Sequence, residues 1–277
     1  MQNTELIFMG KFMKRICIFL FSGTGMTKYV IDHLAQALET LSTQVDLYPI
    51  EETQLQQVSL NNYDLIGIAY PVHAFNAPKI VINFAKQLPD NLSKNVFLIS
   101  TAGEDHPINY SSSQLLMKIL RKKQCSVFYD KQLYMPSNFA IQYDEAKVAA
   151  ILSTVDNTIP QITQEISSSM ERKQSTNALS TCVATLGRAE WFGAIWLGKL
   201  FYADMHCNHC GICSANCPNR NITNGNKVRF RWHCGLCMRC LYICPKHAIK
   251  IRWPFRFLKF NEWYANDKLA IGRRKRT

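Results

Sequence analysis

The stretch RICIFLFSGTGMT, residues 15–27, decides the fold of the larger part of the chain. Residues 15–21 form a nearly continuous apolar run, as in a central parallel strand whose two faces are both covered. A loop of glycine and hydroxyl residues follows. Apolar residues then recur at helical spacing: Val30, Ile31, Leu34, Ala35, Leu38 and Leu41. The loop therefore joins the carboxyl end of a strand to a helix N-terminus, where backbone N–H groups and the helix dipole favour phosphate.

The loop at 22–27 is weak evidence on its own, because a tight strand-to-helix turn also explains it. It lacks the Gly-Lys-Ser/Thr of the Walker loop. The third glycine of the Rossmann fingerprint would fall at Lys28.

The rest of the first 166 residues alternates between strand and helix patterns. Further strands are expected at 45–50, 65–70, 95–101 and 126–135. Helices are expected at 77–88, 109–122 and 144–166, the last one kinked or ended at Pro160. This rhythm predicts an α/β fold with a doubly wound parallel sheet of order 2-1-3-4-5. A ligand would lie at the carboxyl ends of the strands, near the loops 22–27, 71–78 and 101–106.

Eight of the eleven cysteines fall into two matching cassettes, CNHCGICSANCP (207–218) and CGLCMRCLYICP (234–245). The pattern is typical of [4Fe-4S] binding, in which the cysteine before proline reaches the cluster of the opposite cassette. One cluster would be held by Cys207, Cys210, Cys213 and Cys244. The other would be held by Cys234, Cys237, Cys240 and Cys217.

Zinc is the alternative interpretation, because separated Cys-x-x-Cys pairs also form structural zinc sites. Zinc needs four ligands, so it would leave half of the thiolates idle or require two adjacent sites. The repeat extends beyond the cysteines, since CPNRNI (217–222) aligns with CPKHAI (244–249) at an offset of 27 residues. Each half is too small to bury a core, so we expect one pseudo-symmetric unit. A turn within 221–232 would lead into a strand through Val228, Phe230 and Trp232.

A chain of 277 residues has room for about two domains. No apolar run is long enough for a membrane helix, and the nearest, 191–198, is expected to be a buried helix that docks the two domains. No signal-peptide cleavage pattern follows the first apolar run.

Oxygen-labile clusters and unpaired thiols predict the reducing cytoplasm. Cys17, Cys125 and Cys182 are expected to be ordinary buried thiols.

The positive charge is concentrated in the C-terminal part of the chain. Residues 201–277 hold 15 Lys and Arg against 3 Asp and Glu, a net +12 that equals the net charge of the whole chain. A positive face around an electron exit favours an acidic redox partner protein. The basic run 273–276 would also suit nucleic acid or anionic lipid, but no aromatic stacking motif accompanies it, and no nucleic acid is expected.

Two family resemblances cover most of the chain. Residues 201–253 resemble the bacterial-type two-cluster ferredoxins, which implies low-potential electron transfer. Residues 14–165 resemble flavodoxins, which implies FMN bound by the three loops. The implied FMN contacts are Ser22, Gly23, Thr24, Gly25, Met26, Thr27, His73, Ala74, Phe75, Asn76, Thr101, Ala102 and Gly103. Met26 departs from the resemblance, because flavodoxins usually have asparagine there and a thioether cannot donate a hydrogen bond.

As a whole, the chain resembles flavodoxin-fused ferredoxins of anaerobic bacteria and archaea. The resemblance implies an electron-transfer protein with two [4Fe-4S] clusters and FMN. Two other hypotheses stay open: a flavin-dependent reductase with His73 or Tyr70 as proton donor, and a redox-sensing or partner-binding module without FMN. The expected division is an extension at 1–13 with Met13 as an alternative start, a flavodoxin-like domain at 14–166, a linker and docking helix at 167–200, a ferredoxin domain at 201–255 and a basic tail at 256–277.

Overall fold

The structure is a computed structural model that describes residues 13–137 and 143–255. The expected basic tail and residues 1–12 of the expected extension lie outside the described residues. The larger part of the fold is a five-stranded parallel sheet with the order β2-β1-β3-β4-β5, which confirms the predicted topology. Its strands are β1 (Lys14–Leu20), β2 (Thr43–Pro49), β3 (Leu65–Pro71), β4 (Asn95–Ala102) and β5 (Ser126–Tyr134).

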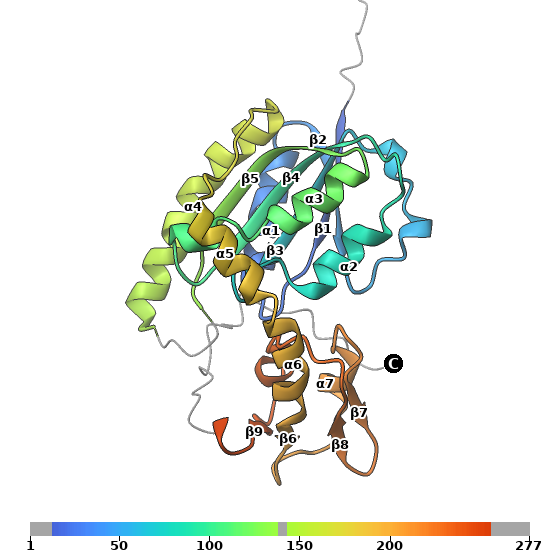
Figure 1. Ribbon diagram of the computed structural model, residues 1–277, viewed down its shortest axis with the longest axis vertical. Helices are drawn as coiled ribbons and strands as arrows, with labels where there is room; N and C mark the ends of the chain where they lie inside the picture. Colours follow the sequence, from blue (N-terminus) through green and yellow to red (C-terminus); the bar gives the residue numbers. More distant parts are fainter. Residues whose placement is uncertain (1–12, 138–142, 256–277) are drawn as a thin grey trace, which may run out of the picture.

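Helices cover both faces of this sheet (Figure 1). On one face α1 (Met26–Glu39) and α4 (Glu145–Ser167) share an apolar cluster with the strands. On the other face α2 (Lys79–Gln87) and α3 (Gln114–Lys122) form a second cluster. Short 3₁₀ turns are η1 (Leu55–Gln57), η2 (Leu60–Asn62) and η3 (Pro107–Asn109). The apolar runs of the strands are thus buried on both faces, as predicted from their composition.

The segment after the sheet differs from what the sequence suggested in one respect. Helix α4 continues through Pro160, so the alternative that the helix ends there was wrong. Within the polar stretch 167–177, which is expected to be a linker, Arg172 forms a parallel bridge with Tyr129 of β5. Its backbone N–H donates to the carbonyl of Phe128 at 2.9 Å, and its carbonyl accepts from the N–H of Asp130 at 2.8 Å.

Residues after this stretch form α5 (Ala178–Gly187), α6 (Glu190–Lys199) and the short strand β6 (Phe201–Ala203), and the helix expected at 191–198 lies within α6. Helix α6 lies between the two parts of the molecule (Figure 1). It is not buried all round, since Phe192 and Trp196 are 69% and 68% exposed. The expected burial of the whole helix was therefore wrong, and its docking role stays a prediction. Among the described residues, no helix is long and apolar enough to cross a membrane.

Residues from β6 onward form a smaller unit at the carboxyl edge of the sheet (Figure 1). Its further elements are α7 (Ile212–Ala215), β7 (Ile222–Asn224), β8 (Val228–Phe230), α8 (Arg239–Tyr242) and β9 (Ile249–Ile251). β6, α7 and β7 recur as β8, α8 and β9, each 27 residues later in the sequence. β6 pairs with β9 and β7 pairs with β8, both antiparallel. The repeat seen in the sequence is therefore a repeat in structure, and its two halves share one apolar cluster.

Candidate functional site

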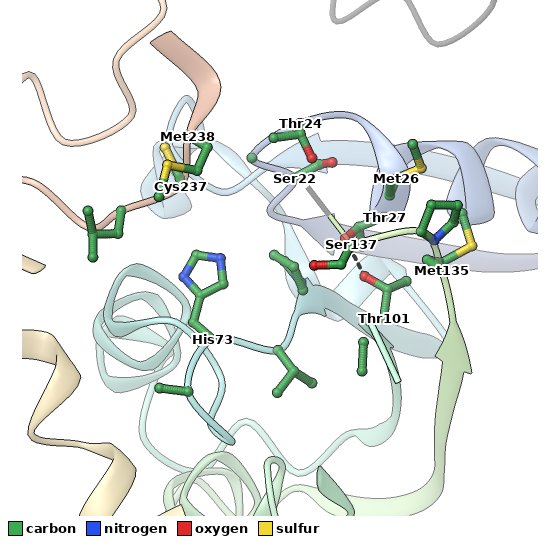
Figure 2. Close-up of a pocket in the computed structure, with 18 of the residues that line it drawn as sticks. Ser22, Thr24, Met26, Thr27, His73, Thr101, Met135, Ser137, Cys237 and Met238 are labelled. Atoms are coloured by element: carbon green, nitrogen blue, oxygen red, sulfur yellow. Dashed lines mark hydrogen bonds between the residues drawn. The ribbon is translucent and has the colours of Figure 1, made fainter. Parts of the chain in front are cut away.

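A cavity of about 450 Å³ lies at the carboxyl ends of the sheet strands, and we call it the edge cavity (Figure 2). It is lined by ten of the thirteen residues predicted to contact FMN. These are Ser22, Gly23, Thr24, Met26, Thr27, His73, Ala74, Thr101, Ala102 and Gly103. The structure thus brings the three predicted loops together at the place that the strand order specifies. Contact of these residues with FMN stays a prediction.

The loop after β1 is shaped to start helix α1. The Ser22 hydroxyl accepts hydrogen bonds from the backbone N–H groups of Gly25 (3.2 Å) and Lys28 (3.3 Å). Gly25 adopts a left-handed φ of 105°, which a glycine reaches without strain. The Thr27 and Thr101 hydroxyls lie 2.8 Å apart and join this loop to the end of β4 (Figure 2). The N–H groups of the first turn of α1 lack intrahelical acceptors, as at any helix start; Ser22 takes that of Lys28, and the positive end of the helix dipole favours an anion here.

Met26 lines the edge cavity and also belongs to the apolar cluster beneath it. It is 5% exposed, so the thioether replaces a polar contact with core packing. Any phosphate contact at this position must come from the backbone N–H. This is the physical consequence of having methionine at a position where flavodoxins usually have asparagine.

Three of the predicted FMN contacts do not line the edge cavity: Gly25, Phe75 and Asn76. The last two belong to the turn after β3. Asn76 is buried, and its amide instead donates to the Ala184 carbonyl at 2.6 Å, which holds α5 against the turn. Ala74 and Phe75 have left-handed φ angles of 42° and 65°, so this tight turn is strained.

Tyr70 and His73, the two candidate proton donors, differ in their position relative to the edge cavity. Tyr70 is fully buried and does not line the edge cavity, so the proposed role for its hydroxyl is not supported by the geometry. His73 lines the cavity, but burial lowers its pKa to about 4, and the ring is neutral at pH 7. Glu190, at the start of α6, also lines the cavity, and desolvation raises its pKa to about 7.

Sequence reasoning missed the residues by which the smaller unit closes the edge cavity. Glu190 and Leu197 come from α6, and Leu236, Cys237 and Met238 come from the second cassette. Figure 2 shows Cys237 and Met238 on the side of the cavity where Ser22 and Thr24 lie. A Cβ on Gly23 would overlap the carbonyl oxygen of Cys237, so the loop after β1 packs directly against the cassette. No local sequence signal reports such packing between two units.

The eight cassette cysteines surround two small cavities, which we call the first and second cysteine cavities. The first is lined by Cys207, Cys210, Cys213 and Cys244. The second is lined by Cys217, Cys234, Cys237 and Cys240. Each set takes three cysteines from one cassette and the last cysteine of the other, as the spacing predicts. Among the described residues, no three Cys, His, Asp or Glu side chains form a site for a single metal ion. The two clusters stay a prediction.

The backbone of the two cassettes repeats as closely as their cysteines do. Left-handed residues recur at an offset of 27 as His209 and Leu236, Gly211 and Met238, and Arg220 and His247. Left-handed residues within a turn direct successive N–H groups to one side and make a nest for an anion. The N–H of Asn221 donates to Cys217 Sγ at 3.2 Å, and the N–H of Ala248 donates to Cys244 Sγ at 3.3 Å. Such N–H···S bonds tune the potential of an iron-sulfur cluster.

Burial raises the pKa of four of the eight cassette thiols: Cys213, Cys234, Cys237 and Cys240. Burial, with further opposition from the neighbouring cysteines, raises the pKa of Cys213 to about 11. Burial likewise raises the pKa of Cys237 to about 11. Bound iron would have to displace these protons. Of the three remaining cysteines, Cys17 and Cys125 are buried as predicted, whereas Cys182 is exposed and the prediction for it was wrong.

Helix α6 contacts the second cysteine cavity through a glycine. A Cβ on Gly198 would overlap the Cys234 side chain and lie 2.7 Å from its Sγ. We expect Gly198→Ala to lower the free energy of unfolding by about 1–3 kcal/mol through overpacking, and to lower the iron content. Gly193→Ala in the same helix is the matched control, because a Cβ there meets nothing within 4 Å. It should stabilise the helix by about 0.5–1 kcal/mol. Urea titration and iron analysis of both variants compare their free energies of unfolding and their iron contents. Equal effects of the two substitutions would show that Gly198 has no special packing role.

Residues 17–139 match the family model described as "Flavodoxin domain". The match covers the sheet and the loops of the edge cavity but less than half of the chain. Together with the strand order, it shows that this part of the chain is a flavodoxin-like domain. No curated protein sequence matches the chain.

Solved flavodoxins are distant neighbours of this structure. An archaeal flavodoxin is 10% identical, with 55% of this chain and 99% of that chain covered and a TM-score of 0.36. A flavodoxin of Streptococcus pneumoniae TIGR4 is 14% identical, with 56% and 97% covered and a TM-score of 0.40. Flavodoxin 2 of Bacillus cereus is 16% identical, with 53% and 99% covered and a TM-score of 0.38. Scores this low leave the fold assignment to the strand order and the family model.

Proposed function

We propose that the chain is an electron-transfer protein in which two [4Fe-4S] clusters exchange electrons with FMN in the edge cavity. Cys237 is the observation that carries this proposal, because it lines both the edge cavity and the second cysteine cavity. A cluster held there would border the flavin position directly. The cluster at Cys207, Cys210, Cys213 and Cys244 would be the outer one, since Cys210 is exposed.

The residues present fit both groups. Hydroxyls of Ser22, Thr24 and Thr27 and the start of α1 would hold the FMN phosphate, and His73 would border the ring. Four thiols and repeated N–H nests suit each cluster. When bound, the clusters supply one-electron transfer and the flavin accepts one or two electrons. The protein holds the groups close together and excludes water, with Leu197, Leu236 and Met238 as apolar walls.

An acidic protein is the proposed external partner, and it would approach the first cysteine cavity. The smaller unit exposes many basic side chains: Arg220, Lys227, Arg229, Arg231, Lys246, Lys250 and Arg252. Asp204 is the acidic residue among its described residues. Such a field speeds the encounter with an acidic partner at low salt. We place the protein in the reducing cytoplasm, because its exposed thiols and proposed clusters need that environment.

Two other functions remain as alternatives to the carrier. A flavin-dependent reductase would need a substrate beside the flavin, and a redox-sensing module would lack FMN. The experiment is anaerobic purification followed by iron, sulfide and FMN analysis. We expect about eight iron atoms and about one FMN per chain. About eight iron atoms without retainable FMN would support the sensing module, and about four or fewer after reconstitution would contradict the two clusters.

A further inference from the structure

The two cysteine cavities repeat each other closely, but they differ at the first residue of the short helix in each cassette. Each cavity takes three cysteines from one cassette and one from the other, and each has one sulfur that accepts a backbone N–H. The differing residue is Ile212 in α7 and Arg239 in α8, and each of them lines the cavity of its own cassette. One cavity thus has an apolar residue at the position where the other has a cation.

The guanidinium of Arg239 is buried and held in one position beside the second cysteine cavity. Nη1 donates to the carbonyl of Asn216 at 3.2 Å, and Asn216 directly precedes Cys217, a proposed cluster ligand. Nη2 contacts Glu51, which does not line the second cysteine cavity. The positive end of the ion pair is therefore the end nearer to the cavity. A buried charge acts strongly on its surroundings, because little water or salt is present to screen it.

The first cysteine cavity has a cation of a different kind. Lys246 lines that cavity and is exposed, whereas the equivalent residue at the second cavity is Asn219. Water screens an exposed ammonium group, so its field is weak compared with that of a buried cation. Of the residues that line the two cavities, Arg239 is therefore the cation with the strongest expected effect on a bound group.

We call the clusters proposed at the two cysteine cavities the first and the second cluster. Resting on the proposed function, we infer that Arg239 raises the reduction potential of the second cluster. A cubane gains one negative charge when it accepts one electron, and a site shielded from water disfavours that charge unless it is compensated. The second cavity is shielded, because α6 packs against Cys234 and the loop after β1 packs against Cys237. Arg239 supplies the compensation, so an electron from the first cluster can enter the second cluster and continue to FMN in the edge cavity.

The test is anaerobic redox potentiometry of the purified protein, followed by electron paramagnetic resonance, with iron and FMN determined on each sample. The signal of the second cluster is the one that Cys217→Ala removes. Arg239→Met should favour the oxidised form of this cluster by about tenfold, which lowers its potential by about 59 mV. Glu51→Gln should favour the reduced form by about threefold or more, because the cation then acts without its counter-ion. Both substitutions break the same ion pair, so loosening of the junction alone would shift the potential in one direction and not in two.

Two comparisons confine the effect to Arg239 and the second cluster. Arg239→Met should leave the potential of the first cluster unchanged, and Lys246→Met should shift the equilibrium of the first cluster by less than about threefold. If Arg239→Met does not retain its iron, the double variant Arg239→Met with Glu51→Met takes its place. The second cluster of this double variant should still have a lower potential than that of the wild type, because the nearer charge of the pair is lost.

Shifts of Arg239→Met and Glu51→Gln in the same direction would overturn the inference and leave the proposed function intact. A second cluster whose potential neither substitution changes, or a double variant at the wild-type potential, would do the same. A wild-type protein with about four or fewer iron atoms after reconstitution would instead contradict the two clusters on which both proposals depend. The iron content and the potentials therefore distinguish the two failures.

Discussion

The Cys217→Ala protein is expected to lose the proposed cluster at the second cysteine cavity and to keep the proposed cluster at the first, although Cys217 belongs to the first cassette. The physical reason is the exchange of the last cysteines, since Cys217 lines the same cavity as Cys234, Cys237 and Cys240. A cubane cluster in this cavity would lack one of its four thiolate ligands, and the other cysteines that line the cavity are already its ligands. Iron should fall from about eight to about four atoms per chain. Iron analysis and electron paramagnetic resonance of the reduced protein measure this loss.

Matched variants identify which cluster is lost. Cys240→Ala removes a ligand of the same set, so its spectrum should coincide with that of Cys217→Ala. Cys213→Ala removes a ligand of the other set and should give a different spectrum with a similar iron content. Cys182→Ala, at an exposed cysteine outside both cassettes, should retain all the iron. If Cys217→Ala matched Cys213→Ala instead, the exchange of ligands between the cassettes would be wrong.

Much of the sheet could be predicted because its strands are short apolar runs closed by turn residues. Such runs are typical of central strands covered on both faces, which the burial of Ile16–Phe19 and of Ile66 and Ile68 bears out. The break between α5 and α6 was harder to see. Its local signal is Gly187, where a Cβ would overlap the carbonyl oxygen of Ala74. Helix α6 is apolar on all sides, which usually indicates full burial. Here the packing partners cover only one side and leave Phe192 exposed.

The candidate site could be predicted as far as it depends on residues near one another in sequence. The loop after β1 and the two cassettes have fixed spacings that local geometry imposes. The closing of the edge cavity by Glu190, Leu197 and Cys237 depends on how two units pack, and no spacing within either unit encodes it. Asn76 lies in one of the predicted loops, but it does not line the edge cavity and instead holds α5. A loop position thus predicts a place near the cavity better than it predicts a side chain that lines the cavity.

Arg239 is expected to be the most important single side chain for the junction of the two units. It is the first residue of α8, and its guanidinium is buried beside the loop after β1. Nη2 lies 2.5 Å from Glu51 Oε1 and donates to the Ser22 carbonyl at 2.7 Å. Nη1 donates to the Asn216 carbonyl in the first cassette at 3.2 Å. One cation therefore joins both cassettes, the loop after β1 and the segment after β2, and a lysine could not reach these acceptors together.

We expect Arg239→Met to lower the free energy of unfolding by about 3–5 kcal/mol, because Glu51 would stay buried without its partner. The double variant Arg239→Met with Glu51→Met should recover most of this loss, since a pair of apolar side chains needs no charge compensation. Lys123→Met is the control, because its partner Asp90 is 83% exposed and the pair should contribute less than about 1 kcal/mol. Urea unfolding of the purified protein, followed by tryptophan fluorescence, measures the free energy of unfolding of all three variants. A loss for Arg239→Met no larger than that of Lys123→Met would mean that the junction is held by apolar packing, and that the ion pair only fixes the orientation of the cassette.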